Sequence, residues 1–548
     1  MIDAAIQGWS GIALGYAAVQ VPMVAALVRG RARLHQFVLS PVFAVPLTAV
    51  AGIGIALSSS VLAHWGIAGD SLTQLIFGAG CCAALGYAGG RKLAHPAGQD
   101  NSHLRGSLVG SHAPATATKS RARAAEITLA GVSIPAQDET KHFKLIGTTG
   151  TGKSTAIREI MTQALARGDR AVIADPDGGY MRRFYRPLRG DVILNPFDQR
   201  SVKWNLFAEI NSNYDVEQLA RSLIPDHDGQ DRSWRGYART FFTAVTRQAH
   251  EAGITDVNEL YRLLVVAETS ELRSLTRGTP AQPFLDEHNS RMFDSIRSVT
   301  SSAVGALEYI GRQEGPDFSI RSWVRDQGPG VLFIPYKAGQ IAALRSTISA
   351  WMRLAIFEAM EQEEVQEKAQ SRCGRNSRLW FVVDELDALG QIDGLKDALA
   401  RLRKFDGRCV LGFQSIAQVS STYGPGDAHT IVENCGNTLI LRCSASEGGG
   451  TARFASQLIG EREVVRTAVS KSRRLTELVG SVTHAQHLSV EPAVLPSQVE
   501  QLPDLAGYLK FASDPTWQRV RLEAKHAWQQ HRRSADQELR SRDGAERD

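Results

Sequence analysis

The residues best suited to chemistry form a glycine-rich stretch that ends in a lysine and two hydroxyl residues. It comprises Gly147, Thr148, Thr149, Gly150, Thr151, Gly152, Lys153, Ser154 and Thr155, and it fits the phosphate-binding spacing G-x-x-x-x-G-K-[ST]. Glycines allow successive backbone N–H groups to turn inward around phosphate oxygens. Lys153 can then reach the β- and γ-phosphates, and the Ser154 hydroxyl can join the ligands of Mg²⁺. The pattern therefore predicts a nucleoside triphosphate site.

Two adjacent carboxylates, Asp384 and Glu385, end an apolar run at residues 379–383. In doubly wound sheets ligands bind at the carboxyl edge, so we expect these side chains to lie beside the phosphate loop. There Asp384 would hold Mg²⁺ through water, and Glu385 would act as general base on the attacking water. An isolated Asp-Glu pair is common, but its place downstream of a phosphate loop makes this prediction specific.

The apolar run at residues 409–413 predicts the next strand, which ends at Gln414. A polar residue at that tip can sense the γ-phosphate, and this order of motifs is typical of RecA-like motors. Residues 388–405, which precede the strand, are expected to form a helix with a basic last turn. Arg403 in that turn has two interpretations: a residue favoured by the helix dipole, or an arginine finger for a neighbouring subunit's nucleotide.

The elements that must position these residues follow from the apolar pattern. A predicted strand at 142–146 and a helix at 154–167 flank the phosphate loop, and the helix dipole favours an anion there. Further strands at 170–174, 191–194 and 330–334 alternate with helical stretches. This pattern predicts an α/β fold: a RecA-like P-loop ATPase domain with a parallel sheet covered by helices on both faces.

Residues 208–320 lack strand-like runs and are expected to form an all-helical domain inserted into the sheet. Within it, Trp234 lies between Arg232 and Arg235. This cluster could stack on and pair with nucleic acid, but a tryptophan that packs between helices is the stronger interpretation.

The first ninety residues carry three apolar segments, at 10–28, 42–62 and 72–90, and a membrane helix needs about 20 such residues. We expect two or three transmembrane helices. Arg29, Arg31 and Arg33 follow the first segment, and Arg91 and Lys92 follow the third, so the positive-inside rule places the later residues in the cytoplasm. Gly86 and Gly90 have the spacing of a helix-packing motif, although this signal is weak in a Gly/Ala-rich segment.

Composition adds broad limits. The chain has 548 residues, a net charge of +5 and six scattered cysteines, which form neither a disulfide framework nor C-x-x-C metal spacing. The mild positive charge permits contact with nucleic acid or anionic lipid without requiring it.

The expected organisation is a transmembrane anchor (1–92), a linker (93–125), the two parts of the nucleotide-binding domain (126–207 and 321–521) around the all-helical domain (208–320), and a charged tail (522–548).

The chain resembles the type IV coupling proteins of bacterial conjugation, and in particular the TrwB/TraD-like family, from about residue 125 to 512. The resemblance rests on the phosphate loop, on Asp384-Glu385, and on motifs without a generic nucleotide role. These are Ile193-Leu-Asn-Pro-Phe-Asp198, Asp317-Phe-Ser-Ile-Arg-Ser-Trp323, Gly412-Phe-Gln-Ser415 and Leu502-Pro-Asp-Leu505. The chain departs from the family pattern in two respects. It has a third candidate membrane span, where the family commonly has two, and residues 423–427 contain no lysine where close relatives place one.

The resemblance implies a DNA-dependent ATPase of the bacterial inner membrane, with its ATPase body in the cytoplasm and with ATP and Mg²⁺ as cofactors. It implies homohexameric rings in which Arg403 acts on the neighbouring nucleotide. The implied partners are membrane lipid, single-stranded or duplex DNA, relaxase, accessory relaxosome proteins and type IV secretion channel proteins. Two alternatives remain at this point: an FtsK-like duplex DNA translocase, and a membrane docking platform in which ATP binding serves assembly.

Overall fold

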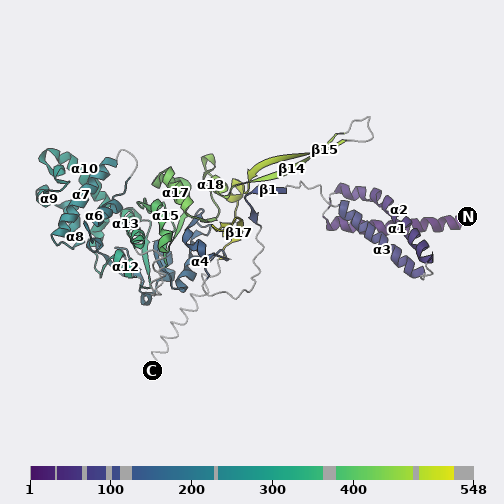
Figure 1. Ribbon diagram of the computed structural model, residues 1–548, viewed down its shortest axis with the longest axis horizontal. Coiled ribbons are helices and arrows are strands. Elements are labelled where there is room, and N and C mark those ends of the chain that lie inside the picture. Colours follow the sequence, from purple (N-terminus) through teal and green to yellow (C-terminus); the bar gives the residue numbers. More distant parts are fainter. Residues whose placement is uncertain are drawn as a thin grey trace, which may run out of the picture. The chain divides into compact units, whose positions relative to one another are not determined.

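The structure is a computed structural model that describes residues 2–30, 32, 34–64, 71–93, 102–110, 126–226, 232–326, 328–361, 378–472 and 481–523. The chain divides into two compact units, Met1–His103 with Val464–Ser489, and Leu104–Glu463 with Val490–Asp548. The first unit contains the N-terminal helices α1 to α3, and the second contains the central sheet (Figure 1). The basic linker residues Lys119, Arg121 and Arg123 and most of the expected tail lie outside the described residues.

The three apolar segments form helices α1 (Ile2–Arg29), α2 (Leu34–His64) and α3 (Ser71–Leu93). Among the described helices, two stretches are long and apolar enough to cross a membrane, Gly11–Arg29 in α1 and Gln36–Ala56 in α2. These two stretches correspond to the first two segments expected from the sequence. The third segment forms helix α3 as expected, but it is not among the described stretches that are long and apolar enough to cross a membrane.

Small residues allow α3 to approach α1 closely. A Cβ atom on Gly86 would lie 2.1 Å from the Val19 carbonyl oxygen, and one on Gly90 would lie 2.4 Å from the Met23 carbonyl oxygen. Only glycine fits at such distances, so the helix-packing interpretation of the Gly86/Gly90 pair is confirmed. A hydrogen bond of 2.9 Å from Gln20 Nε2 on α1 to Ser40 Oγ adds a polar contact with α2.

A ten-stranded mixed sheet runs through the described part of the second unit. The strands from β13 to β7 are parallel, whereas β16 pairs antiparallel with β13 and β17 pairs antiparallel with β16. The parallel sheet predicted from the sequence is confirmed; the antiparallel flank was not predicted. In order across the sheet the strands are β2 (Val109–Gly110), β17 (Trp517–Arg521), β16 (Ala506–Lys510), β13 (Asn437–Ile440), β5 (Phe143–Ile146), β12 (Gly407–Phe413), β11 (Leu379–Val383), β6 (Arg170–Pro176), β10 (Val331–Tyr336) and β7 (Val192–Ile193).

Helices cover both faces of the sheet, as the continuously apolar strands require. Along β11, Phe381 and Val383 belong to the hydrophobic core that includes α13 (Ile341–Met360), whereas Trp380 belongs to the core that includes α4 (Lys153–Ala166). Alternate side chains of one strand therefore enter different cores. The other helices that pack in this unit are α5 (Gly179–Phe184), α12 (Ile320–Asp326), α15 (Leu395–Leu402), α16 (Ile416–Tyr423), α17 (Pro425–Asn434), α18 (Gly450–Ile459) and α19 (Pro496–Glu500).

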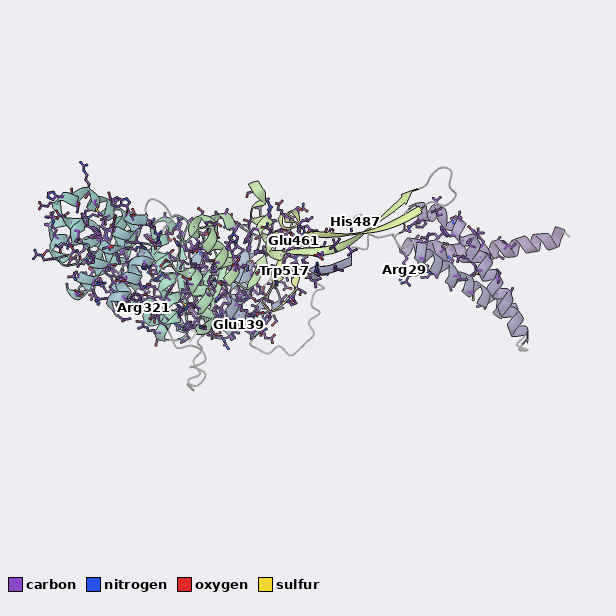
Figure 2. All side chains as sticks on the ribbon, turned by 45° about the horizontal axis from the view of Figure 1, so that its top comes forward. Arg29, Glu139, Arg321, Glu461, His487 and Trp517 are labelled. Carbon is purple, nitrogen blue, oxygen red and sulfur yellow. The ribbon has the colours of Figure 1, made fainter. Side chains whose placement is uncertain are left out.

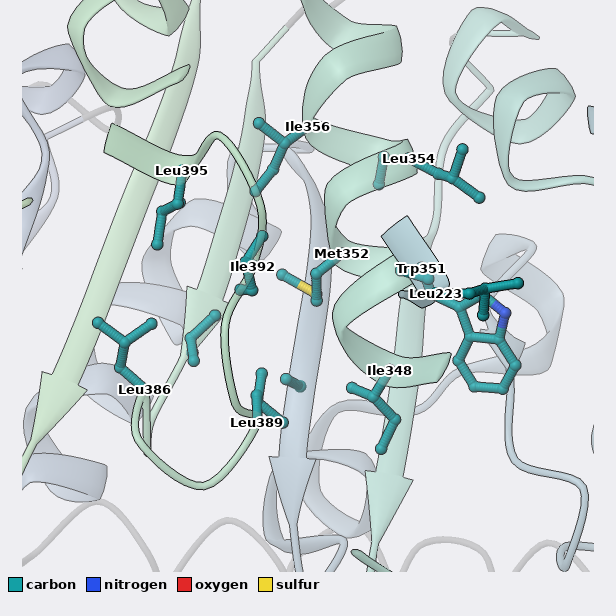
Figure 3. Close-up of a cluster of buried hydrophobic side chains, with 14 of the residues drawn as sticks. Leu223, Ile348, Trp351, Met352, Leu354, Ile356, Leu386, Leu389, Ile392 and Leu395 are labelled. Atoms are coloured by element: carbon teal, nitrogen blue, oxygen red, sulfur yellow. The ribbon is translucent and has the colours of Figure 1, made fainter. Parts of the chain in front are cut away.

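The expected helix at residues 388–405 is wrong in its first half. Helix α15 begins only at Leu395, and a 3₁₀ turn, Arg403–Phe405, follows it. The preceding loop is buried, and Figure 3 shows its Leu389 and Ile392 beside Met352 of α13. Apolar residues three positions apart imitate helical spacing here, but Gly390 and Gly394 adopt φ of 74° and 73°, which ends any helix.

A helical insertion lies between β8 (Lys203–Trp204) and β9 (Asp317–Phe318), which pair with each other. The buried Glu209 carboxylate joins its two ends, because it accepts hydrogen bonds from Trp204 Nε1 at 3.0 Å and from the Ile320 N–H at 2.7 Å. Arg321, labelled in Figure 2, donates its backbone N–H to the same carboxylate. The helices of the insertion are α6 (Asn213–Leu223), α7 (Arg232–Glu251), α8 (Val257–Tyr261), α9 (Thr269–Leu275), α10 (Ser290–Val304) and α11 (Ala306–Gly311).

Several strands occur where the sequence analysis expected none. Strand β1 (Ser102–Gly106) and β2 fall within the expected linker, and β1 joins β14 (Glu461–Ser472) and β15 (Ser481–Pro492) in a three-stranded sheet. A short hairpin, β3 (Thr128–Leu129) with β4 (Val132–Ser133), precedes the phosphate loop. The expected linker is therefore partly built into sheets.

The buried His142 side chain joins the start of β5 to two other elements. Its Nε2 bonds the Leu399 carbonyl oxygen at 2.9 Å, and its Nδ1 accepts the Cys409 N–H at 3.1 Å. This pairing requires the neutral imidazole, and burial lowers the pKa of His142 to about 4.

We therefore expect the contribution of His142 to the free energy of unfolding to be lost in acid. Because the folded pKa lies below the unfolded one, the contribution is complete above pH 6.5 and is lost as the pH falls towards 4. The free energy of unfolding of the wild type should fall faster than that of His142→Asn between pH 6.5 and 5, by roughly 1.4 kcal/mol per pH unit. Chemical denaturation followed by tryptophan fluorescence measures this difference. His288→Asn, at an exposed position, serves as control, and equal slopes for wild type and His142→Asn would contradict the assignment.

Candidate nucleotide-binding site

The phosphate loop connects β5 to α4 at the carboxyl edge of the sheet. Gly150 and Gly152 adopt φ of 78° and 122°, conformations that side chains with a Cβ rarely take. The Lys153 ammonium donates to the Gly147 carbonyl oxygen at 2.6 Å, which holds the side chain along the loop. Burial lowers the pKa of Lys153, while Asp384 and Glu385 oppose that shift. The loop thus presents a positive charge that a phosphate can compensate.

Asp384 lies directly opposite the first turn of α4. The Ser154 hydroxyl donates to Asp384 Oδ2 at 2.7 Å, and the Tyr180 hydroxyl donates to the same oxygen, also at 2.7 Å. Asp384 is 4% exposed, and its Oδ1 has no hydrogen-bond partner among the described residues. A buried carboxylate oxygen without a partner beside a serine hydroxyl fits a hydrated divalent cation.

The surroundings of Asp384 fit Mg²⁺ better than a metal held by protein ligands alone. Within the described residues no group of three or more His, Cys, Asp or Glu side chains could hold a metal ion. Mg²⁺ is commonly bound through one or two protein oxygens together with substrate phosphates and waters. The structure brings the Ser154 and Asp384 oxygens within 2.7 Å of each other, an arrangement that fits this mode of binding.

Glu385 and Gln414 form a second polar contact at the same edge. Gln414 Nε2 donates to Glu385 Oε1 at 2.9 Å, and Gln414 Oε1 accepts the Thr149 hydroxyl at 2.9 Å. Gln414 therefore connects the phosphate loop with the predicted general base. Burial and the neighbouring Asp384 raise the pKa of Glu385, which strengthens it as a proton acceptor.

Gly412 explains why β12 can lie so close to these carboxylates. A Cβ atom at this position would lie 2.3 Å from the Asp384 carbonyl oxygen and 3.2 Å from its Oδ1. The Gly412 carbonyl oxygen also accepts the Leu386 N–H at 2.9 Å, which fixes the chain just after Glu385. The Gly412-Phe-Gln-Ser415 motif thus combines a required glycine with the glutamine that contacts Glu385 and Thr149.

The motif Leu502-Pro-Asp-Leu505 contributes Leu505 to the lining of the pocket. Leu505 adopts a φ of 65°, and its N–H donates to the Thr151 carbonyl oxygen at 2.9 Å. The pocket has a volume of about 260 Å³ and combines residues from four separate segments of the chain. It is lined by Thr149, Gly150, Gly152, Lys153, Ser154, Thr155, Arg158, Asp384, Glu385, Gln414 and Leu505.

Arg403 does not belong to this pocket. It is exposed on the 3₁₀ turn that precedes β12, at the opposite end of that strand from Gln414. The seven residues of β12 span roughly 20 Å, so Arg403 lies far from the phosphate loop of its own chain. This position is open to a neighbouring molecule.

Trp234 also lies away from the pocket. It packs against the hydrophobic core in part and meets the Tyr237 ring edge-on, with ring centroids 5.9 Å apart. The interpretation of Trp234 as a packing residue therefore has a structural basis. Its remaining surface lines a separate cavity of about 630 Å³.

Sequence reasoning missed three residues at the site: Tyr180, Arg158 and Leu505. None belongs to a generic nucleotide motif. Helical spacing one turn after Ser154 could have pointed to Arg158, because it follows on the same helix. The positions of Tyr180 and Leu505 depend on tertiary contacts, which no local pattern records.

Comparison with known proteins was made for sequence and for structure. Residues 126–523 match the model of the type IV secretion-system coupling protein DNA-binding domain. The coupling protein TraD of Escherichia coli (strain K12) is 31% identical over 390 residues, which cover 70% of this chain and 53% of TraD. A conjugal transfer protein TraG of Escherichia coli is 24% identical over 411 residues, 66% of this chain and 62% of TraG. The chain thus spans little more than half the length of these relatives.

Solved structures of the bacterial conjugative coupling protein TrwB are also similar. TrwB in complex with the ATP analogue ADPNP is 31% identical, with a TM-score of 0.66 over 79% of this chain and 96% of that chain. TrwB in complex with ADP and Mg²⁺ is 32% identical, with the same TM-score and coverage. Because the family model covers most of the chain, and a curated relative and solved structures agree with it, this chain belongs to the family of type IV secretion-system coupling proteins.

Proposed function

We propose that this chain is a membrane-anchored ATPase that drives DNA transfer through a type IV secretion channel during bacterial conjugation. It recruits the relaxase–DNA complex with accessory relaxosome proteins and uses ATP hydrolysis to move the DNA. The observation that carries this proposal is the convergence of Lys153, Asp384 and Glu385 on one pocket. That pocket lies within the stretch matched to the coupling-protein DNA-binding domain.

Hydrolysis follows from the chemistry of the pocket. Lys153 and the N-terminus of α4 hold the phosphates of ATP. Mg²⁺, which Ser154 and Asp384 would hold, supplies positive charge that balances the charge on the phosphate oxygens. Glu385 accepts a proton from the water that attacks the γ-phosphorus, and the hydrogen bond from Gln414 orients it. The TrwB structures with ADPNP and with ADP and Mg²⁺ support the same ligands here.

The N-terminal helices supply the anchor in this proposal. The two apolar stretches of α1 and α2 have the length and composition to cross the bacterial inner membrane. Arg29 at the end of α1 and Arg91 at the end of α3 favour the cytoplasm. Both can lie there when α3 also crosses the membrane, and the ATPase body and its DNA and relaxase partners then lie on the cytoplasmic side. The channel proteins then meet the chain at the membrane.

A homohexameric ring completes the active site. Since Arg403 is exposed and lies at the far end of β12 from its own pocket, it can stabilise transferred phosphate only in a neighbouring subunit. We assign it the role of the trans-acting arginine finger.

The function predicts that DNA accelerates ATP hydrolysis. Purified protein in detergent should release phosphate faster when single- or double-stranded DNA is added, since DNA is the load that the motor moves. Lys153→Ala, which removes the phosphate-binding ammonium, is the control and should show no DNA response. A wild-type rate that is the same with and without either kind of DNA would contradict translocation and favour a docking platform.

The arginine-finger role predicts complementation between two inactive variants. Arg403→Ala alone should lose roughly 10³-fold in turnover, as should Lys153→Ala alone. Mixed rings of the two should regain part of the activity, because each arginine-deficient subunit can receive Arg403 from its neighbour. Phosphate release from mixtures at varied ratios measures this effect. Arg401→Ala, at an exposed arginine in the last turn of α15 just before Arg403, is the matched control, and full activity of Arg403→Ala rings would refute the role.

A further inference from the structure

Tyr180 is fixed between the carboxyl ends of two neighbouring strands. Its N–H donates to Asp175 Oδ1 at 3.0 Å, and its hydroxyl donates to Asp384 Oδ2 at 2.7 Å. The two aspartates occupy equivalent places, because Ala174 of β6 pairs with Val383 of β11 directly before them. A single residue thus ties the end of β6, through its backbone N–H, to the end of β11, through its side-chain hydroxyl.

The surroundings leave Tyr180 little freedom to move. Its side chain is 2% exposed, and the Arg158 guanidinium lies 5.7 Å from the centre of its ring. The following N–H, that of Met181, donates to Asp175 Oδ2 at 2.7 Å, so both oxygens of Asp175 hold the first turn of α5. The hydroxyl of Tyr180 is therefore aimed at Asp384 by the fold.

Two donors on one oxygen fix the orientation of the Asp384 carboxylate. Ser154 and Tyr180 both donate to Oδ2, and Oδ1 is left buried without a partner among the described residues. The Ser154 hydroxyl oxygen can bind a cation while its proton still reaches Asp384. Tyr180 reaches the same carboxylate from α5 and adds nothing to the ligand set.

We propose that Tyr180 is a positioning residue for the divalent cation: it fixes the orientation of the Asp384 carboxylate, which would help to hold the cation. The inference rests on the proposed function only in that nucleotide binds together with a divalent cation. Without the Tyr180 hydroxyl, Asp384 keeps a single donor and can rotate. The cation then binds less tightly, although the phosphate loop itself is unchanged.

Tyr180→Phe in the full-length protein tests this role, with Mn²⁺ as the probe. Mn²⁺ titrations in the presence of ADP, followed by electron paramagnetic resonance, should show an affinity roughly 10-fold lower than that of the wild type. ADP affinity in EDTA should stay unchanged, because the hydrogen bond that the substitution removes is the one to Asp384. Tyr185→Phe is the matched control, since Tyr185 directly follows the same helix and packs against Phe333, and it should leave both affinities as in the wild type.

Different results separate the positioning role from the wider function. Equal Mn²⁺ affinity in wild type and Tyr180→Phe would overturn the proposal. So would an equal loss of ADP affinity with and without metal, because Tyr180 would then only support the shape of the pocket. If Mn²⁺ binding falls as expected while hydrolysis shows no response to DNA, the positioning role stands and the motor function fails.

Discussion

The parallel pairing of β5, β12, β11 and β6 is the constraint on which the rest of the structure depends. Because their carboxyl ends meet at one edge, the phosphate loop, Gln414, Asp384 and Asp175 come together from distant parts of the chain. Gly412 allows this approach, since any side chain there would strike the Asp384 carbonyl oxygen. The register of these parallel strands therefore determines which side chains meet in the pocket.

The remaining family motifs make contacts that stabilise the sheet and the phosphate loop. The Asn195 amide donates to the Pro335 carbonyl oxygen at 2.7 Å, next to the end of β10. Trp323 packs against the Arg170 guanidinium at 4.2 Å, where β6 begins. Leu505 supports the phosphate loop through Thr151.

The sequence was sufficient to predict the parallel core and its site because these depend on local patterns. Apolar runs that end in Gln414, or in Asp384 and Glu385, predict both the strands and the polar residues at their carboxyl ends. The buried loop before α15 was misread, since Leu386, Leu389 and Ile392 repeat every three residues in a segment that glycines keep from being helical. The antiparallel strands β16 and β17 and the role of Tyr180 depend on long-range pairing, which no local pattern contains.

The central claim is that the sheet edge forms a hydrolytic site with Glu385 as its base. Glu385→Gln keeps the shape and hydrogen-bonding capacity of this side chain but removes its ability to accept a proton. The account predicts that the variant binds ATP with wild-type affinity, while single-turnover hydrolysis falls at least roughly 10²-fold. Wild-type turnover in Glu385→Gln would contradict the account, because the proton would then leave by another route.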